Sequence, residues 1–430
     1  MRATRRQVLL GTTAVAAAAA MPKIEFARAA DQTTIEWWHI SQNDPGLTAF
    51  QDAANAYMAD HPDVKINVTV LANEDFKAKL ATVMQGGSGV PDMFQSWGGG
   101  VLYQYADAGL VRDITADLAK DDWGTTFNPA ALGLYANNGK NYGVPWDMGI
   151  VGMWYNKSLF TKAGIDAPPT TWDELLDDVK KLQAAKITPI AVGEGDKWPG
   201  HFWWVYQAIR MGGKSAFDAA YTRQGKFTDQ PFIDAGTNLK ALIDLKPFQD
   251  GFLAATYNEA DTYMANGNAA MELMGQWLPG NQKALAENKT GLGDDLGFFP
   301  FPGVDGGAGQ PTDVLGGCDG FAFSAKAPDA ALDFARYITA RKVQTDMAGN
   351  GVAVLPTVNG ADSAIDDPNL KAVAEALKSA TYLQLYYDQF LPPAVGGVVN
   401  DATQQLFAGT ASPEEIAQTI EDSAAQELAS

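Results

Sequence analysis

Apolar and polar residues alternate along the first third of the chain with two different periods. Residues 33–39 and 64–70 show the two-residue period of strands. Apolar residues at helical spacing over 50–58 predict a helix that ends at the following proline, and a second helix is predicted over 74–85. A short strand follows around 93–94. Strand, helix, strand, helix, strand in this order predicts an open α/β sheet with helices on both faces.

The same alternation resumes in the middle of the chain. A strand is predicted over 151–155 and a helix over 175–185, which opens with a capping box formed by Thr171 and Glu174. Ser412, with a glutamate three residues later, opens the last helix in the same way. We therefore expect α/β structure to the end of the chain.

A Gly- and Pro-rich segment, residues 300–317, is the longest break in this periodicity. We interpret it as a crossover between two lobes; an ordinary surface loop is the alternative. A chain of 430 residues exceeds the size at which a single core stops growing, so two domains are expected.

The N-terminus has the features of an export signal. Arg5 and Arg6 precede an alanine-rich run, and a small-x-small site ends at Ala29, which together are typical of a twin-arginine signal over residues 1–29. A membrane anchor is the alternative, but it needs a run of about 18 strongly apolar residues. Cys318 is the only cysteine, so neither lipid attachment near the cleavage site nor an internal disulfide is possible. We expect a periplasmic or secreted, freely diffusing monomer.

Charge narrows the choice of partners. Removal of residues 1–29 takes away five basic residues and one acidic residue, which changes the formal charge from -20 to -24. Nucleic acid and anionic membranes are poor partners for such a surface, because each phosphate contact normally needs a lysine or arginine. A strongly anionic sugar is disfavoured for the same reason.

The sequence offers little for metal or nucleophilic chemistry. His39, His61 and His201 are the only histidines, and none has a second ligand at metal-binding spacing. A Walker-type loop and a nucleophile elbow are both missing from the sequence. We expect no cofactor and no metal.

Aromatic and short polar residues gather instead at turns next to strands, and in open α/β sheets ligands lie beyond the carboxyl ends of the strands. An aromatic face meets the C–H face of a sugar ring, while carboxylates and amides bind its hydroxyl groups, so the pattern favours a neutral carbohydrate. The candidate ligand-binding residues are Trp37, His39, Gln42, Asp44, Asp92, Trp97, Trp146, Asp147, Trp198, His201, Trp277, Gly317, Asp319, Tyr387 and Gln389.

Each candidate also has a structural explanation. Core packing is the usual fate of a tryptophan, and we expect it for Trp154, Trp172 and Trp204. Trp277 is different, because glycines and prolines flank it on both sides. Asp92 could cap a turn instead of binding a ligand. The hypothesis depends on the joint occurrence of these residues.

Several runs in this set resemble a known family. The run 155–157, Tyr-Asn-Lys, precedes a short helix and then residues 169–174, Pro-Thr-Thr-Trp-Asp-Glu; the runs 89–92 and 316–322 match as well. With these motifs the chain resembles the solute-binding proteins of ABC sugar importers, the broad family that includes maltose-binding protein. The runs around Trp37 and Trp198 look most like members that handle xylobiose and related plant disaccharides.

The resemblance implies a two-lobed, periplasmic-binding-protein-like (type II) α/β fold with a hinge and an interlobe ligand cleft. It places the chain crossings near 144–145, 311–315 and 343–352, the first lobe at 30–144 and 315–343, and the second at 145–314 and 344–430.

The function implied is non-enzymatic receipt of a neutral di- or oligosaccharide, xylobiose-like or glucobiose-like, and its delivery to ABC permease subunits. A buried, inert Cys318 is also expected. Two other functions stay open. A glycoside hydrolase would use two of Asp92, Asp147 and Asp319 at about 5 or about 6.5–9.5 Å, and a polyamine receptor would use similar aromatic and acidic residues.

Overall fold

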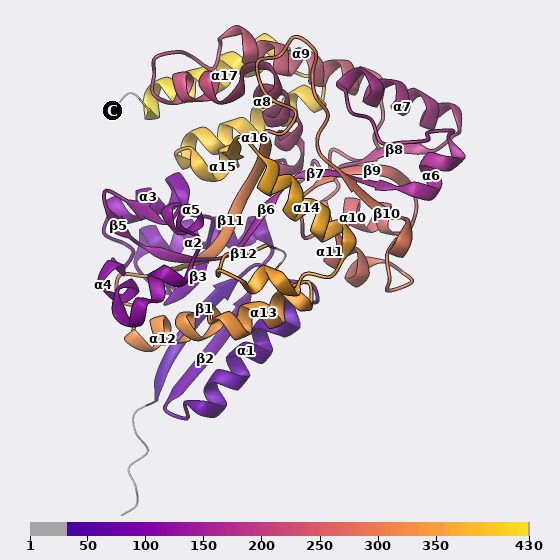
Figure 1. Ribbon diagram of the computed structural model, residues 1–430. Helices are drawn as coiled ribbons and strands as arrows, with labels where there is room; N and C mark the ends of the chain where they lie inside the picture. The colour runs from indigo at the N-terminus through magenta and orange to yellow at the C-terminus, as the bar shows by residue number, and fades with distance from the viewer. Residues whose placement is uncertain (1–31, 354, 429–430) are drawn as a thin grey trace, which may run out of the picture.

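Two separate β-sheets organise the molecule, and each forms the centre of one lobe (Figure 1). The computed structural model describes residues 32–353 and 355–428, so the expected export signal at 1–29 lies outside the described residues. The chain adopts the two-lobed periplasmic-binding-protein-like fold that the sequence predicts. Among the described helices, none has the length and apolar character needed to cross a membrane.

The first lobe is built on a seven-stranded sheet in the order β12-β6-β11-β3-β1-β2, with β13 paired to β11. β1 runs parallel to β2 and β3, whereas β11 is antiparallel to β3 and β6. The strands are β1 (Thr33–His39), β2 (Val64–Val70), β3 (Met93–Ser96), β6 (Gly143–Ile150), β11 (Val314–Phe323), β12 (Leu355–Pro356) and β13 (Leu383–Leu385). The first two match the predicted strands residue for residue.

Helices join the parallel strands of this lobe. α1 (Gly46–Asp60) connects β1 to β2, and α2 (Asn73–Gly86) connects β2 to β3. α1 buries Phe50 and Tyr57, and α2 buries Phe76 and Leu80, which are the apolar positions at helical spacing. The predicted alternation of strands and helices is confirmed.

The second lobe is built on a four-stranded sheet in the order β10-β7-β9-β8. These strands are β7 (Gly152–Asn156), β8 (Thr188–Ala191), β9 (Ala269–Met274) and β10 (Leu296–Phe299). The helices of this lobe include α7 (Trp172–Ala184), α8 (Trp198–Tyr221), α9 (Gln230–Asp244), α10 (Tyr257–Ala265), α11 (Leu278–Leu285), α14 (Pro368–Ser379), α15 (Tyr387–Phe390), α16 (Pro393–Phe407) and α17 (Pro413–Glu427).

Both predicted capping boxes are present in this lobe. The Thr171 hydroxyl accepts the Glu174 backbone N–H at 3.3 Å, and Ser412 accepts that of Glu415 at 3.2 Å. Each bond satisfies an N–H at a helix start that has no partner within the helix.

The chain crosses between the sheets at places that differ in part from the expected ones. β6 stays hydrogen-bonded to β11 as far as Ile150 and continues into β7 after Val151 alone, so the first crossing follows Ile150 and not Val144-Pro145. Residues 300–313 lead from β10 to β11, which supports the crossover interpretation of that segment.

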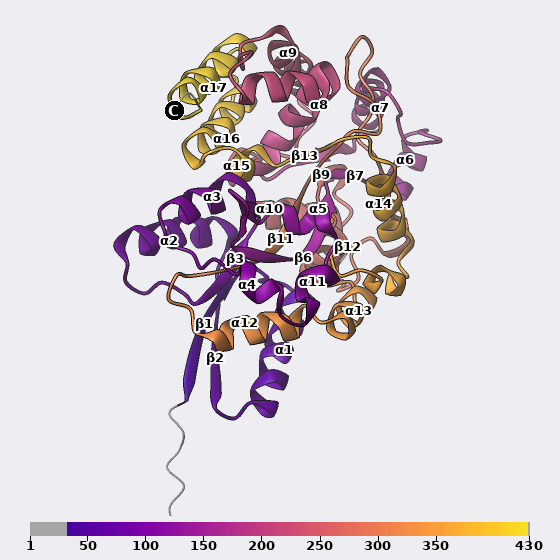
Figure 2. The ribbon, with the colours of Figure 1, turned by 60° about the vertical axis from the view of Figure 1, so that its left-hand side comes forward.

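The third crossing lies later than residues 343–352. α13 (Arg341–Gly349) sits with α12 (Asp329–Ile338) beside the first sheet in both views (Figures 1 and 2). Met347, Val352 and Val358 are buried in the core of the first lobe, whereas Leu370 of α14 is buried in that of the second. Apolar burial therefore keeps most residues up to about Ala361 with the first lobe, while Ala348 and Leu355 pack with the core of the second.

Candidate ligand-binding site

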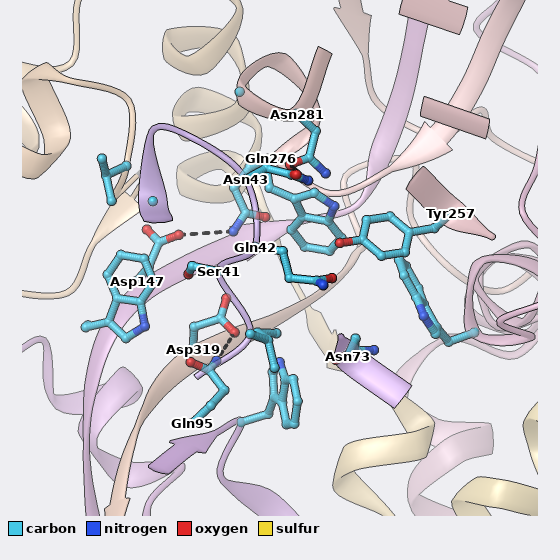
Figure 3. A pocket seen from close by; sticks show the side chains of 18 of the residues that line it. Ser41, Gln42, Asn43, Asn73, Gln95, Asp147, Tyr257, Gln276, Asn281 and Asp319 are labelled. Atoms are coloured by element: carbon cyan, nitrogen blue, oxygen red, sulfur yellow. Dashed lines mark hydrogen bonds between the residues drawn. The ribbon is translucent and has the colours of Figure 1, made fainter. Parts of the chain in front are cut away.

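A pocket opens between the two lobes, and both contribute to its walls (Figure 3). The first lobe supplies the loop after β1, residues 40–46, together with the start of α2 and the end of β3. The second lobe supplies the starts of α8, α10 and α11, and the end of α15. The free space amounts to about 1130 Å³, counting the part that opens to solvent. A concave space walled by residues of two lobes is a common place for a small-molecule site.

The structure brings nine of the candidate residues together on the pocket walls. They come from separate stretches of sequence and are Gln42, Asp44, Trp97, Trp146, Asp147, Trp198, Trp277, Asp319 and Gln389. The sheet edge and the helix starts that converge here position them.

Trp37 and His39 do not reach this pocket. Trp37 is fully buried and packs against Phe50 and Phe334 in the core of the first lobe. His39 lies against the same core, and burial lowers the pKa of its imidazole to about 4. The end of β1 is covered on both faces, so only residues after His39 can line the pocket.

Asp92 also lies away from the pocket. It precedes β3 and accepts the backbone N–H of Glu36 at 2.8 Å, whereas Trp97 follows β3 and lines the pocket. At about 3.3 Å per residue, the strand places these two residues about 16 Å apart. Asp92 therefore lies at the other end of its strand, where it binds the backbone of the neighbouring strand β1 and neither lines the pocket nor caps its own turn.

Gly317, His201 and Tyr387 lie behind the wall. A Cβ at Gly317 would stand 2.2 Å from the ring of Tyr386, so the glycine lets that ring pack on β11 and line the pocket. His201 is buried, with its Nδ1 atom 2.8 Å from the Trp198 carbonyl oxygen. Tyr387 is buried in the core of the second lobe.

Aromatic rings stand on both sides of the pocket. Trp97 belongs to the first lobe, whereas Trp198, Tyr257 and Trp277 form a cluster on the second. The Trp198 ring lies 5.1 Å from that of Tyr257 and 6.2 Å from that of Trp277, centroid to centroid. Flat apolar faces of this kind are available for stacking with a ligand.

Asp319 supplies a carboxylate to the wall of the first lobe. Gln95 donates to its Oδ1 atom at 2.7 Å (Figure 3). Burial raises the pKa of Asp319 to about 7, although hydrogen bonds from Gln95 and Trp97 act in the opposite direction. The pairing of β11 with β6 shifts register just after Asp319, and such irregularities often re-aim a side chain beside a site.

Asp147 is held from several sides at the pocket floor. Its Oδ1 atom accepts the Leu355 N–H at 2.7 Å, and its Oδ2 atom accepts from Gln276 Nε2 at 3.2 Å. Gln276 comes from the second lobe, so this contact links the lobes. Only glycine at position 149 leaves room for the Gln276 amide, because a Cβ there would stand 1.7 Å from its Oε1 atom.

An ion pair that we did not predict also lines the pocket. Lys77 Nζ lies 3.2 Å from Asp388 Oδ2 and 3.1 Å from Glu74 Oε1. Burial alone would raise the pKa of Asp388, but Lys77 and His201 outweigh it and lower that pKa. Burial likewise opposes the charge on Lys77, but the two carboxylates raise the pKa of its ammonium. No sequence signal pairs residues that are 311 positions apart.

Amide side chains were missed as well, and they connect the lobes. Asn43 of the first lobe donates to Asn258 Oδ1 at 3.2 Å and to Asn281 Oδ1 at 3.4 Å in the second. Asn73, at the start of α2, completes the polar lining. Asparagine in a polar loop has no distinctive pattern, so only the fold could identify these residues.

Metal ligands are not gathered in the part of the chain that the structure describes, where no cluster of three or more His, Cys, Asp or Glu side chains could hold an ion. Cys318 is buried, as expected.

A two-lobed α/β fold with a pocket at the lobe interface is typical of solute-binding proteins. The chain belongs to the bacterial extracellular solute-binding protein family, whose model matches residues 42–345. It is 27% identical over 364 residues to the multiple sugar-binding protein of Streptococcus mutans, covering 80% of this chain and 81% of that protein. It is 25% identical to a probable sugar-binding periplasmic protein of Rhizobium meliloti, covering 94% of this chain and 96% of that one.

Solved structures give the same result. A chitin oligosaccharide binding protein superimposes with a TM-score of 0.85 at 26% identity, over 93% of this chain and 100% of the other. A protein from work on xylan utilization by the thermophilic bacterium Caldanaerobius polysaccharolyticus gives a TM-score of 0.84 at 27% identity, over 90% and 99% of the two chains. The family is one of extracellular solute-binding proteins, and relatives named for binding sugars support an extracytoplasmic sugar-binding protein.

Proposed function

We propose that this protein is the exported substrate-binding protein of an ABC sugar importer, and that it binds a neutral di- or oligosaccharide between its lobes and delivers it to the permease. One observation carries the proposal: aromatic rings from both lobes face a single pocket whose polar lining consists mostly of amides and carboxylates. Stacking on a sugar ring and hydrogen bonding to its hydroxyl groups need these two kinds of side chain.

The charges in the pocket favour a neutral ligand. Lys77 is the only basic residue among the lining residues, and both Glu74 and Asp388 already neutralise it. The carboxylates of Asp147 and Asp319 would repel an anionic sugar. A uronic acid is therefore expected to bind at least tenfold more weakly than the matching neutral sugar.

The placement of aromatic rings on both lobes favours more than one sugar ring. The Trp198 cluster of the second lobe and Trp97 of the first offer separate platforms. Xylobiose-like and glucobiose-like disaccharides are the first ligands to test.

A receptor returns its ligand unchanged, and the surroundings of Asp147 support that role over hydrolysis. Both of its oxygens accept hydrogen bonds from the protein, and it lies at the buried floor. A glycosidase instead needs one carboxyl group free to protonate the leaving oxygen and a second to attack or activate water.

Calorimetric titration with neutral mono- and disaccharides, each recovered afterwards and analysed by chromatography, tests the proposal. We expect micromolar or tighter binding of a disaccharide and its recovery intact. Cleavage of the disaccharide would show that the protein is a hydrolase and would overturn the proposed receptor function. Binding of a polyamine in place of every sugar would also overturn the proposal.

A further inference from the structure

Two carboxyl groups lie in contact behind the wall of the pocket. Asp261 on α10 is 0% exposed and Glu272 on β9 is 1% exposed. They are within hydrogen-bonding reach of each other, and no N–H or O–H of the described residues donates to either oxygen of Glu272. Two touching carboxylates in apolar surroundings cannot both stay charged, so they share a proton.

Asn281, which lines the pocket, connects the carboxyl pair to it. Asp261 Oδ2 accepts from the Asn281 amide nitrogen at 2.9 Å. A charged carboxylate can only accept, so it turns the Asn281 NH₂ group toward itself and leaves the carbonyl facing the other way. There the Asn281 Oδ1 atom accepts from Asn43 of the opposite lobe at 3.4 Å. Both side chains lie on the same side of the pocket (Figure 3).

We propose that Asp261 and Glu272 are positioning residues for ligand binding: while they share one proton, they hold the Asn281 carbonyl toward the ligand and toward Asn43, and a second proton releases it. The inference rests on the proposed function, because it takes the pocket of Asn281 to be the sugar site. Once Asp261 is neutral it can donate as well as accept, and the Asn281 amide is then free to turn over. Ligand affinity should therefore fall in mildly acidic solution.

The electrostatic surroundings support a second protonation at mildly acidic pH. Burial raises the pKa of both carboxyl groups, and Asp261 raises that of Glu272 further. Tyr257 lies on the same helix, α10. Burial is the main cause that raises the pKa of its phenol, and the charge of Asp261 raises that pKa further. Asp196 accepts the Tyr257 backbone N–H at 2.8 Å and is a further acid near that phenol.

The strands on either side of β9 and the helix α11 bring no charge to the pair. The strands on either side of β9 place Trp154 and Ala191 beside Glu272. α11 brings the amide of Asn281. Other titrating groups around the pocket, such as Asp319 and His201, are unchanged in every variant described below and contribute the same pH effect to each. The test therefore compares, between variants, the ratio of affinities at two pH values.

Calorimetric dissociation constants for the best disaccharide at about pH 7.5 and about pH 5 test the proposal on wild type, Glu272→Gln and Asp261→Asn. The amide that Glu272→Gln introduces can donate to Asp261 permanently and keeps that carboxylate ionised. Glu272→Gln should therefore bind within threefold of wild type at the higher pH. Its ratio of dissociation constants between about pH 5 and about pH 7.5 should be at least fivefold smaller than that of wild type. Asp261→Asn should bind at least tenfold more weakly at the higher pH. The exposed Asp250→Asn is the matched control and should follow wild type.

The same acid loss in Glu272→Gln as in wild type would overturn the proposal, as would wild-type affinity in a folded Asp261→Asn. If Asp261→Asn does not fold, the ratio of the dissociation constants of Glu272→Gln at the two pH values tests the proposal by itself. If the wild type binds no sugar at either pH, the proposed function fails first. Carbon-13 shifts of the two carboxyl groups then test the pair directly, and independent titrations at ordinary pKa values would refute it.

Discussion

Individual tryptophans have different roles, because some line the pocket and others are packed in a core. Trp277 is half-buried on the pocket wall, whereas Trp172 is 4% exposed and packs against Phe301 and Trp203. Trp277→Ala should weaken disaccharide binding by more than tenfold, or about 1.4 kcal/mol, with the fold intact. Trp172→Ala should lower the free energy of unfolding by about 3–5 kcal/mol. Unchanged affinity of Trp277→Ala in calorimetry would contradict its role as a platform.

Two aspartates that looked alike in sequence now have different expectations. Asp319 faces the pocket and Asp92 does not. At about pH 8, where Asp319 is ionised, Asp319→Asn should weaken sugar binding about tenfold, because a carboxylate makes stronger hydrogen bonds to hydroxyl groups than an amide does. Asp92→Asn is the control, and its affinity should stay within twofold of wild type. Equal losses in the two variants would show that the effect is not local to the pocket.

Asp319 also predicts how stability depends on pH. Its pKa is about 7 in the folded protein and about 3.9 in an unfolded chain. Between these values the folded state binds more protons, so this group makes the free energy of unfolding fall as pH rises from about 4 to about 7. Asp319→Asn lacks this contribution, so its melting temperature should increase relative to that of wild type as pH rises from about 4 to about 7. A constant difference between the two melting curves would contradict the prediction.

At the level of elements, strand β11 shapes the pocket through a missing side chain. The Tyr386 ring lies where a Cβ at Gly317 would be, at 2.2 Å. Gly317→Ala must displace that ring toward the ligand and should weaken binding by at least tenfold. Gly397→Ala, on the exposed face of α16 with no atom near the added methyl group, is the matched control. It should leave affinity unchanged and add up to about 1 kcal/mol of stability. Equal affinities in the two variants would exclude this role for Gly317.

At the level of the whole molecule, ligand binding should couple to closure of the lobes. The pocket takes aromatic residues from both lobes, so only a closed cleft brings all of them onto one ligand. A disaccharide should bind at least tenfold more tightly than its monosaccharide, and saturation should reduce the radius of gyration in small-angle X-ray scattering. A monosaccharide that binds as tightly as every disaccharide, or an unchanged scattering profile, would contradict this expectation.

Much of the architecture could be predicted because its signals are local. The alternation in β2 and the capping box of Thr171 depend on residues a few positions apart, and both are present. The lobe boundaries were less accurate because a crossing is defined by long-range pairing. β6 joins the first sheet up to Ile150 only because β11, more than 160 positions later, pairs with it.

The sequence by itself determined the α/β alternation, the family and the sugar-binding type of side chain, because periodicity, capping and motif spacing are written in neighbouring residues. The tertiary structure decided which of those side chains meet. It buried Trp37, moved Asp92 to the far end of its strand, and paired Lys77 with Asp388. Exposure and charge pairing depend on contacts between residues hundreds of positions apart, and those contacts exist only once both lobes have folded.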